Sequence, residues 1–200
     1  MMKSDLMNMR KTAVFILLII SCIFTSVFFS CASRMSDSEA RVILADLIPL
    51  SQELNRVFWG DGIQLENEDA IALDTVTTAQ YYPVSDDCPY RCVADMKAAA
   101  EKVFSLDYLE SVYTMLFLGL DEAGIEPRFA DNDDGLLTVD ICFETYSFNT
   151  EIYPETAVVK ESGAGLINIE VGCMTGGELG KMNITLRQQN GEWRIDSPTY

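Results

Sequence analysis

Histidine is absent from the 200-residue sequence. Its absence excludes Ser-His-Asp and Cys-His catalysis, and it removes a ligand on which most catalytic zinc sites depend. An enzyme built on this chain has to use carboxylates, tyrosines or a thiolate. The sequence also contains no recognisable catalytic signature. We therefore expect a protein that is not an enzyme and that has no cofactor and no metal.

Basic residues are scarce as well, with 14 lysines and arginines against 31 aspartates and glutamates and a net charge of −17. Without residues 1–31 the remainder keeps 11 basic and 30 acidic residues, so its net charge is −19. Such a surface repels nucleic acid and anionic lipid headgroups, which excludes a nucleic-acid partner. It attracts cationic partners, although acidity also simply keeps an exported domain soluble.

The N-terminal segment is where the few positive charges and the apolar residues gather. Lys3, Arg10 and Lys11 precede residues 13–29, which are uncharged. This order is typical of the n-region and h-region of an export signal. Because the positive flank stays in the cytoplasm, the acidic remainder is expected at the outer face of the cytoplasmic membrane.

Three kinds of anchor fit this segment. A lipidated Cys31 is the favoured one, because the polar sequence CASRMSDSEA starts there. An uncleaved helix is the second, since the apolar run is nearly the length of about 20 residues that spans a bilayer. Cys22 is a second choice for lipidation, with Ile19, Ile20 and Ser21 before it.

The rest of the chain is predicted to be a tether over residues 32–37 and a single domain over residues 38–200, a length sufficient for one core. Apolar residues recur at helical spacing up to Phe58, and Ser36, Asp37 or Ser38 can cap the helix. Pro49 is expected to kink or split it.

Two more helices are predicted over residues 93–105 and 106–119, with Ser105 capping the second. A short extended piece, QYYPV, precedes them.

The C-terminal part has the alternation of strands, in the segments IEPRFA, LLTVDICFE, TAVVKES, GLINIEVGC, KMNITLRQ and EWRID. Asn190-Gly191 between the last two is a strong hairpin signal. Helices followed by antiparallel strands indicate an α+β fold. We expect N-terminal helices packed on a curved antiparallel sheet of five to six strands, as in cystatin-like or nuclear-transport-factor-2-like domains.

Four cysteines follow the leader: Cys88, Cys92, Cys142 and Cys173. Disulfides are expected first for an exported domain, ahead of free thiols and a structural zinc site. Cys88 to Cys92 is the easiest local closure. Cys142 to Cys173 can join neighbouring strands if their Cα atoms lie within about 7 Å.

Two further patterns bear on function. Asp140 and Glu144 alternate along one predicted strand, so they share a face that is either solvated or the wall of a pocket in which one carboxyl acts as an acid. The acidic FADNDDGLL does not fit a calcium loop and is predicted to be a turn.

Aromatic side chains flanked by glycine and proline form the candidate binding surface. The alternative is that they cover the core. The set comprises Trp59 and Asp61 in FWGDG, Tyr81 and Tyr82 in QYYPV, and Tyr90 in CPYRC.

A family resemblance rests on FWGDGI, on YYPVSDDCPYRCVADMKAAAEKVFSLDYLESVY, on PRFADNDDGLLTVD and on the closing NGEWRIDSPTY. With these segments the chain resembles exported clostridial lipoproteins of unknown function and, more loosely, the IseA-type inhibitors of peptidoglycan D,L-endopeptidases. The resemblance implies a small exported IseA-like domain that covers the active-site groove of a cell-wall hydrolase. It assigns no individual inhibitory residue.

Two functions are therefore expected. The first is a surface-anchored binding module of a Gram-positive cell, which docks a cell-wall protein with a basic face. The second is a ligand-pocket domain, either a carrier or a histidine-free enzyme that uses Asp140 or Glu144.

Overall fold

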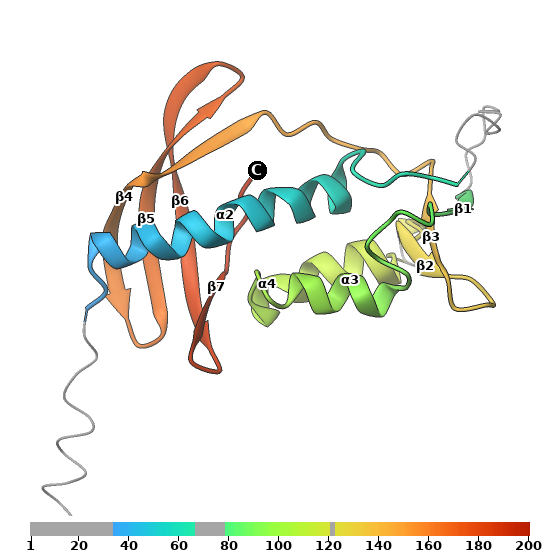
Figure 1. Cartoon of the computed structure of the whole chain (residues 1–200), viewed down its shortest axis with the longest axis horizontal. Coiled ribbons are helices and arrows are strands. Elements are labelled where there is room, and N and C mark those ends of the chain that lie inside the picture. Colours follow the sequence, from blue (N-terminus) through green and yellow to red (C-terminus); the bar gives the residue numbers. More distant parts are fainter. Residues whose placement is uncertain (1–33, 67–78, 121–122) are drawn as a thin grey trace, which may run out of the picture. The chain divides into compact units, whose positions relative to one another are not determined.

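A 23-residue helix, α2 (Asp37–Trp59), organises the part of the chain that our computed structural model describes, namely residues 34–66, 79–120 and 123–200 (Figure 1). Ser36 begins it with a capping box. Its Oγ accepts from the Glu39 backbone N–H at 3.3 Å, and its own N–H donates to the Glu39 carboxylate at 2.8 Å. Ser36 is one of the three predicted caps. The compact unit starts at Met35, so residues 35–37 of the expected tether belong to it.

Pro49 does not split α2, which is continuous through it. A proline in a helix interior removes one backbone hydrogen bond and crowds the preceding turn. Buried side chains on both sides of it keep the helix on the core: Leu44, Leu47 and Ile48 before it, and Leu54 and Phe58 after it. Their packing outweighs the local cost.

Two short helices follow, α3 (Val93–Ala100) and α4 (Leu106–Tyr113), and α4 continues into the π-helical turn η2 (Thr114–Leu118). Ser105 caps α4 by accepting from the Tyr108 N–H at 3.0 Å, as predicted. The helix predicted to reach residue 105 ends five residues earlier, at Ala100. The chain between α3 and α4 pairs instead with a strand, since Ile195 N donates to Val103 O and Ser105 N donates to Ile195 O.

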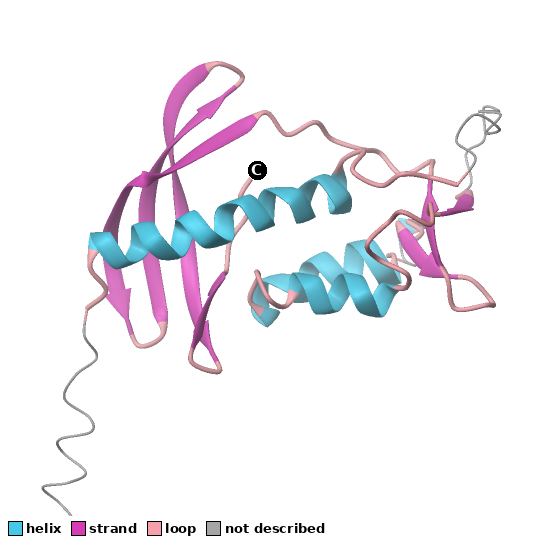
Figure 2. Ribbon diagram, viewed as in Figure 1, coloured by secondary structure: helices cyan, strands magenta, loops and turns pink. Residues whose placement is uncertain are grey.

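The strands form two antiparallel sheets (Figure 2). The smaller sheet has the order β1-β3-β2, built from β1 (Tyr81–Pro83), β2 (Phe129–Asp131) and β3 (Leu137–Asp140). The larger has the order β4-β5-β6-β7, built from β4 (Thr150–Gly163), β5 (Leu166–Thr175), β6 (Glu178–Gln189) and β7 (Glu192–Ile195). The α+β class is confirmed. In the described residues the strands divide into sheets of three and four rather than one sheet of five to six.

The predicted hairpin at Asn190-Gly191 joins β6 to β7. Both residues have positive φ, 52° and 86°, as a type I′ turn requires. The predicted turn at residues 131–135 is also present. There Asn132 Oδ1 accepts from the N–H groups of Asp134 and Leu136, and Gly135 has a φ of 76°.

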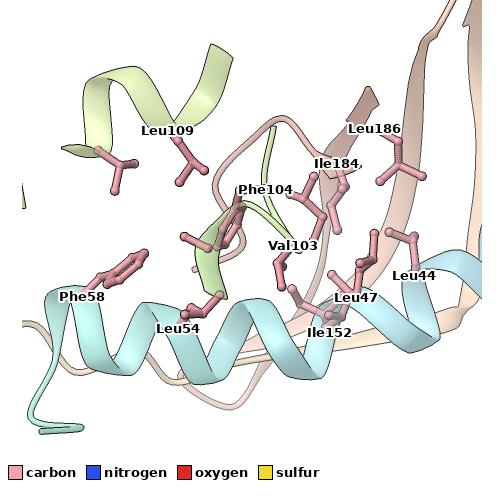
Figure 3. Close-up of a cluster of buried hydrophobic side chains, with 14 of the residues drawn as sticks. Leu44, Leu47, Leu54, Phe58, Val103, Phe104, Leu109, Ile152, Ile184 and Leu186 are labelled. Carbon is pink, nitrogen blue, oxygen red and sulfur yellow. The ribbon is translucent and has the colours of Figure 1, made fainter. Parts of the chain in front are cut away.

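The core lies along one side of α2 (Figure 3). Leu44 and Leu47 point toward Ile152, Ile184 and Leu186 of the four-stranded sheet. Further along, the side chains Leu54 and Phe58 point toward the segment that carries α3 and α4, represented by Val103, Phe104 and Leu109. One helix therefore supports both the sheet and the helix pair.

Both edges of the four-stranded sheet have backbone groups bonded to neighbouring segments. On β4, Ala157 O accepts from Arg41, Val159 N–H donates to Asp37, and Thr150 O accepts from Gln52. All three side chains come from α2. The β7 edge is paired with residues 103–105. Such coverage protects a sheet from joining another strand.

Within the described ranges, no helix has the combined length and apolarity needed to cross a membrane. The export signal, Cys22 and Cys31 lie outside those ranges.

Candidate functional site

Asp140 and Glu144 do not share a strand face, so that prediction is wrong. The strand β3 ends at Asp140, whose buried side chain accepts hydrogen bonds from the backbone N–H of Gln80 at 2.8 Å and of Cys142 at 3.0 Å. Those bonds turn the chain away, and Glu144 is exposed beyond the strand. Neither carboxylate lines any of the cavities described below.

Arg128 is a buried cation beside Asp140, only 3% exposed. It donates to the carbonyl oxygens of Phe58 and Gly60 and thereby satisfies the C-terminal end of α2. Its guanidinium also lies over the ring of Phe143, 5.1 Å from the centroid. Burial lowers the pKa of Arg128 to about 10, against the opposing effect of Asp140 and Asp61. The residue is still charged at neutral pH, and these contacts give it a structural role.

Only some residues of the predicted aromatic surface line a cavity, and the others are buried or half-buried elsewhere. Trp59 is buried in the core, so the core-covering alternative holds for it. Tyr81 is half-buried and donates to Pro127 O, while Tyr82 is half-buried on the same strand. Tyr90 and Asp61 are different, because both line one cavity. The structure thus brings together two of the five predicted surface residues.

This cavity lies between the end of α2 and the CPYRC segment and has a volume of about 350 Å³. A second, smaller cavity of about 180 Å³ shares Glu53 and Tyr90 with it. We call the two together the Tyr90 groove. The larger part is lined by Glu53, Arg56, Val57, Asp61, Gly62, Ile63, Cys88, Pro89 and Tyr90. The smaller part is lined by Leu50, Glu53, Leu54, Tyr90, Ala99, Lys102 and Val103.

The two parts of the Tyr90 groove differ in chemistry. Glu53 lines both parts, but the larger also has Asp61 and Arg56 at its wall, whereas the smaller is mostly aliphatic and includes Leu50, which is 48% exposed. Burial, together with the charges of Glu53 and Cys88, raises the pKa of the Tyr90 phenol. The phenol is therefore neutral at physiological pH and can donate a hydrogen bond at the junction of the two parts.

Six exposed aspartates lie in two hydrogen-bonded segments, residues 86–95 and 131–134, and we call them the acidic face. The first of these segments contains Cys88, Pro89 and Tyr90 of the groove. The segments are joined by a hydrogen bond from Val93 N to Asp131 Oδ1 at 2.8 Å and by one from Leu137 N to Arg91 O at 2.7 Å. The members of the acidic face are Asp86, Asp87, Asp95, Asp131, Asp133 and Asp134.

Arg91 is the one basic residue within those two segments, and it pairs with Asp86 at 2.8 Å. Nowhere in the described residues do three or more cysteine, aspartate or glutamate side chains converge as metal ligands.

The four cysteines of the domain are free thiols in the structure. Cys88 lines the Tyr90 groove, and Cys92 precedes the first residue of α3. Cys173 is buried on β5, whereas Cys142 is exposed in the turn that follows β3. Cys142 and Cys173 are therefore not on neighbouring strands, and the reason for expecting that pairing is wrong.

Sequence reasoning missed the contribution of α2 to the groove. In the sequence, Glu53 and Arg56 have the positions expected for the solvated face of an amphipathic helix, and their spacing does not distinguish them from ordinary surface residues. The one available signal was Leu50, an apolar residue on the same face. No protein-family model matches this sequence, and no curated protein is significantly similar to it.

Proposed function

We propose that this protein is a non-enzymatic binding module of a Gram-positive cell envelope, held at the outer face of the cytoplasmic membrane. Its acidic face and Tyr90 groove dock a cell-wall protein that presents a basic surface. The anchor is a lipidated Cys31 or an uncleaved N-terminal helix. The resemblance to IseA-type inhibitors favours a peptidoglycan hydrolase as the partner, with docking as the means of inhibition.

The observation that carries this proposal is the continuity of the two surfaces. Asp86 and Asp87 of the acidic face are followed directly by Cys88, Pro89 and Tyr90 of the groove. A partner that approaches through the field of the aspartates therefore meets a concave, partly apolar site on arrival. Interfaces commonly combine such steering charge with an aromatic anchor at a pocket.

The enzyme form of the ligand-pocket alternative loses its original support. It depended on Asp140 and Glu144 sharing one wall, and the chain turns between them. Asp140 is occupied by two backbone N–H groups, which leaves it poorly suited to proton transfer.

The test uses the membrane-extracted full chain to capture its partner from a cell-wall extract, followed by affinity measurements with the captured protein. The variant D133N/D134N neutralises two charges of the acidic face whose carboxylates make no hydrogen bond within the described residues. E155Q/E178Q removes the same charge from exposed positions on β4 and β6. Y90A removes the aromatic anchor.

Docking by charge predicts that D133N/D134N weakens binding several-fold at low salt and less at physiological salt, where the Debye length is about 8 Å. Y90A is expected to weaken binding about tenfold at either salt concentration. An equal effect of E155Q/E178Q, or affinity that is independent of salt, would contradict the proposal.

A further inference from the structure

The smaller part of the Tyr90 groove has the size and the lining of a pocket for one apolar side chain. Leu54 and Val103, which are 4% and 3% exposed, form its floor, and Leu50 lines its wall with 48% of its surface exposed. An apolar cavity of about 150 Å³ holds one benzene ring, so the volume of about 180 Å³ here admits a single large aliphatic or aromatic group. A group that covered Leu50 would also remove apolar surface from water.

The charges that line the groove balance one another. Among the described residues that line its two parts, Glu53 and Asp61 are acidic, and Arg56 and Lys102 are basic. Glu53 and Lys102 both line the smaller part, so an ion that entered there would be attracted by one and repelled by the other. Such an ion would lose hydration without a net opposite charge to compensate it. The side chain that fits the smaller part is therefore uncharged.

The acidic face determines which charge is favoured beside the groove. Its two segments contain six aspartates against one arginine, a net charge of −5. Asp86 and Asp87 precede Tyr90 by four and three residues, so their Cα atoms lie within about 14 Å of the Tyr90 Cα. Such a face repels a second copy of this acidic chain and attracts a basic segment.

We propose that the Tyr90 groove binds a segment of the partner protein in which one large apolar side chain is flanked by lysines or arginines. The apolar side chain enters the smaller part, against Leu50 and Tyr90, and the basic residues stay in water beside the acidic face. In an extended segment, about four residues span the distance of about 14 Å, so the basic residues lie within about four positions of the apolar one. This inference rests on the proposed docking function, because it names the chemistry of the partner at the same site.

Three acetylated and amidated peptides test the apolar side chain: KKGLGKK, KKGAGKK and KKGKGKK. Each is titrated into the full chain in detergent, and the backbone amide resonances of Leu50 and Tyr90 report the occupancy of the groove. The leucine peptide is expected to bind about tenfold more tightly than the alanine peptide, because it buries more apolar surface. The peptide with a central lysine has one more positive charge and is expected to bind no more tightly than the alanine peptide, which separates the apolar contact from general attraction to an acidic domain.

Two further probes test the flanking residues. The neutral peptide QQGLGQQ keeps the leucine and is expected to bind several-fold more weakly than KKGLGKK at low salt, with a difference that shrinks as the salt concentration rises. N-acetylleucinamide offers the apolar side chain without any flanking chain. If it bound as tightly as KKGLGKK, the occupant would be a small apolar molecule and the proposal would be wrong.

Substitutions in the protein assign the contacts. L50Q places a polar side chain of similar size at the wall of the smaller part, and it is expected to weaken binding of the leucine peptide several-fold and to leave the alanine peptide unchanged. L118Q makes the same change outside the groove, at a residue of η2 that is 69% exposed, and is expected to bind like the wild type. D133N/D134N is expected to weaken both peptides by the same factor, because it alters only the charge of the acidic face.

Equal affinity for the leucine and alanine peptides would overturn the proposal, as would the absence of saturable shifts with KKGLGKK or wild-type binding of that peptide by L50Q. The peptide comparison uses the wild-type protein and does not depend on the folding of any variant. A failure here is distinct from a failure of the docking function. If the captured cell-wall protein depends on the acidic face and on Tyr90 but not on Leu50, only the apolar side chain was wrongly inferred. If it does not depend on the acidic face either, the docking function is wrong as well.

Discussion

The two halves of α2 use their polar side chains in different ways. In the first half Asp37 and Arg41 bond to the backbone of β4, and the helix lies on the four-stranded sheet. In the second half Gln52 still bonds to β4 and Asn55 bonds to Thr199, whereas Glu53 and Arg56 bond to no other element and instead line cavities. The buried Arg128 satisfies the helix end. The polar side chains Asp37 and Arg41 of the first half are structural, and those of the second half include residues of the candidate site.

The difference shows how one helix can provide both stability and recognition. Side chains that bond to a strand edge are unavailable to a partner. Side chains next to loops keep unused hydrogen-bonding capacity and lie where partners can reach them. The candidate binding residues therefore lie at the end of α2 that faces loops.

The largest expected effect comes from breaking the core in either half. L44A is expected to lower the free energy of unfolding by about 2 to 5 kcal/mol, and F58A by about 3 to 5 kcal/mol, because both side chains are almost fully buried. Urea unfolding can be followed by Trp59 near the groove and by Trp193 in the sheet, each as the sole tryptophan. If α2 couples the halves, both probes report one transition in each variant. Two separate midpoints would show that the halves unfold independently.

A smaller effect distinguishes Arg128 from Arg41, which both donate to backbone carbonyls. R128L leaves the buried Phe58 and Gly60 carbonyls unpaired and is expected to cost about 3 kcal/mol of unfolding free energy. R41L removes one bond, to Ala157 O, at an exposed position and is expected to cost about 1 kcal/mol. Chemical denaturation of both variants measures the difference. If R128L and R41L lowered the free energy of unfolding equally, the proposed difference between the two ends of α2 would be wrong.

The smallest effect is the contribution of Tyr81, on β1 of the three-stranded sheet, to the dependence of stability on pH. Burial, with Asp140 and Glu126 nearby, raises the pKa of Tyr81 to about 12, above the ordinary value of 10. The neutral phenol is thus favoured in the folded state. Its contribution to stability is complete below pH 10 and is lost as the pH rises through about 12.

Thermal unfolding at pH 8 and pH 11 tests this dependence. Y81F, which cannot ionise, is expected to lose less stability between the two pH values than the wild type. An identical loss in both proteins would assign the alkaline sensitivity to other groups.

Local signals predicted much of the secondary structure. A helix cap among residues 36–38, the Ser105 cap and the Asn190-Gly191 hairpin depend on residues close in sequence, and all three are confirmed, with Ser36 as the first cap. The predicted alternative that Pro49 splits the helix is wrong, because the local cost of proline is outweighed by burial, which involves Leu44 and Phe58 contacting distant segments.

The division into two sheets and the position of the cavities required tertiary information. Alternation continues through Asp140 to Glu144, and only the bond from Gln80, which is remote in sequence, shows why the strand ends at Asp140. Asp61 and Tyr90 were identified as surface residues from their glycine and proline neighbours. That they line one cavity together with Glu53 depends on how α2 and the CPYRC segment come together in space.

The bonds along β4 and β7 have a consequence for crowded conditions. Another molecule that tried to extend the sheet would first have to displace Arg41, Asp37 and Gln52 on one side and residues 103–105 on the other. Each displacement costs hydrogen bonds already formed within the chain. At high local concentration, neighbouring copies of the protein should therefore not pair strand to strand into an extended intermolecular sheet.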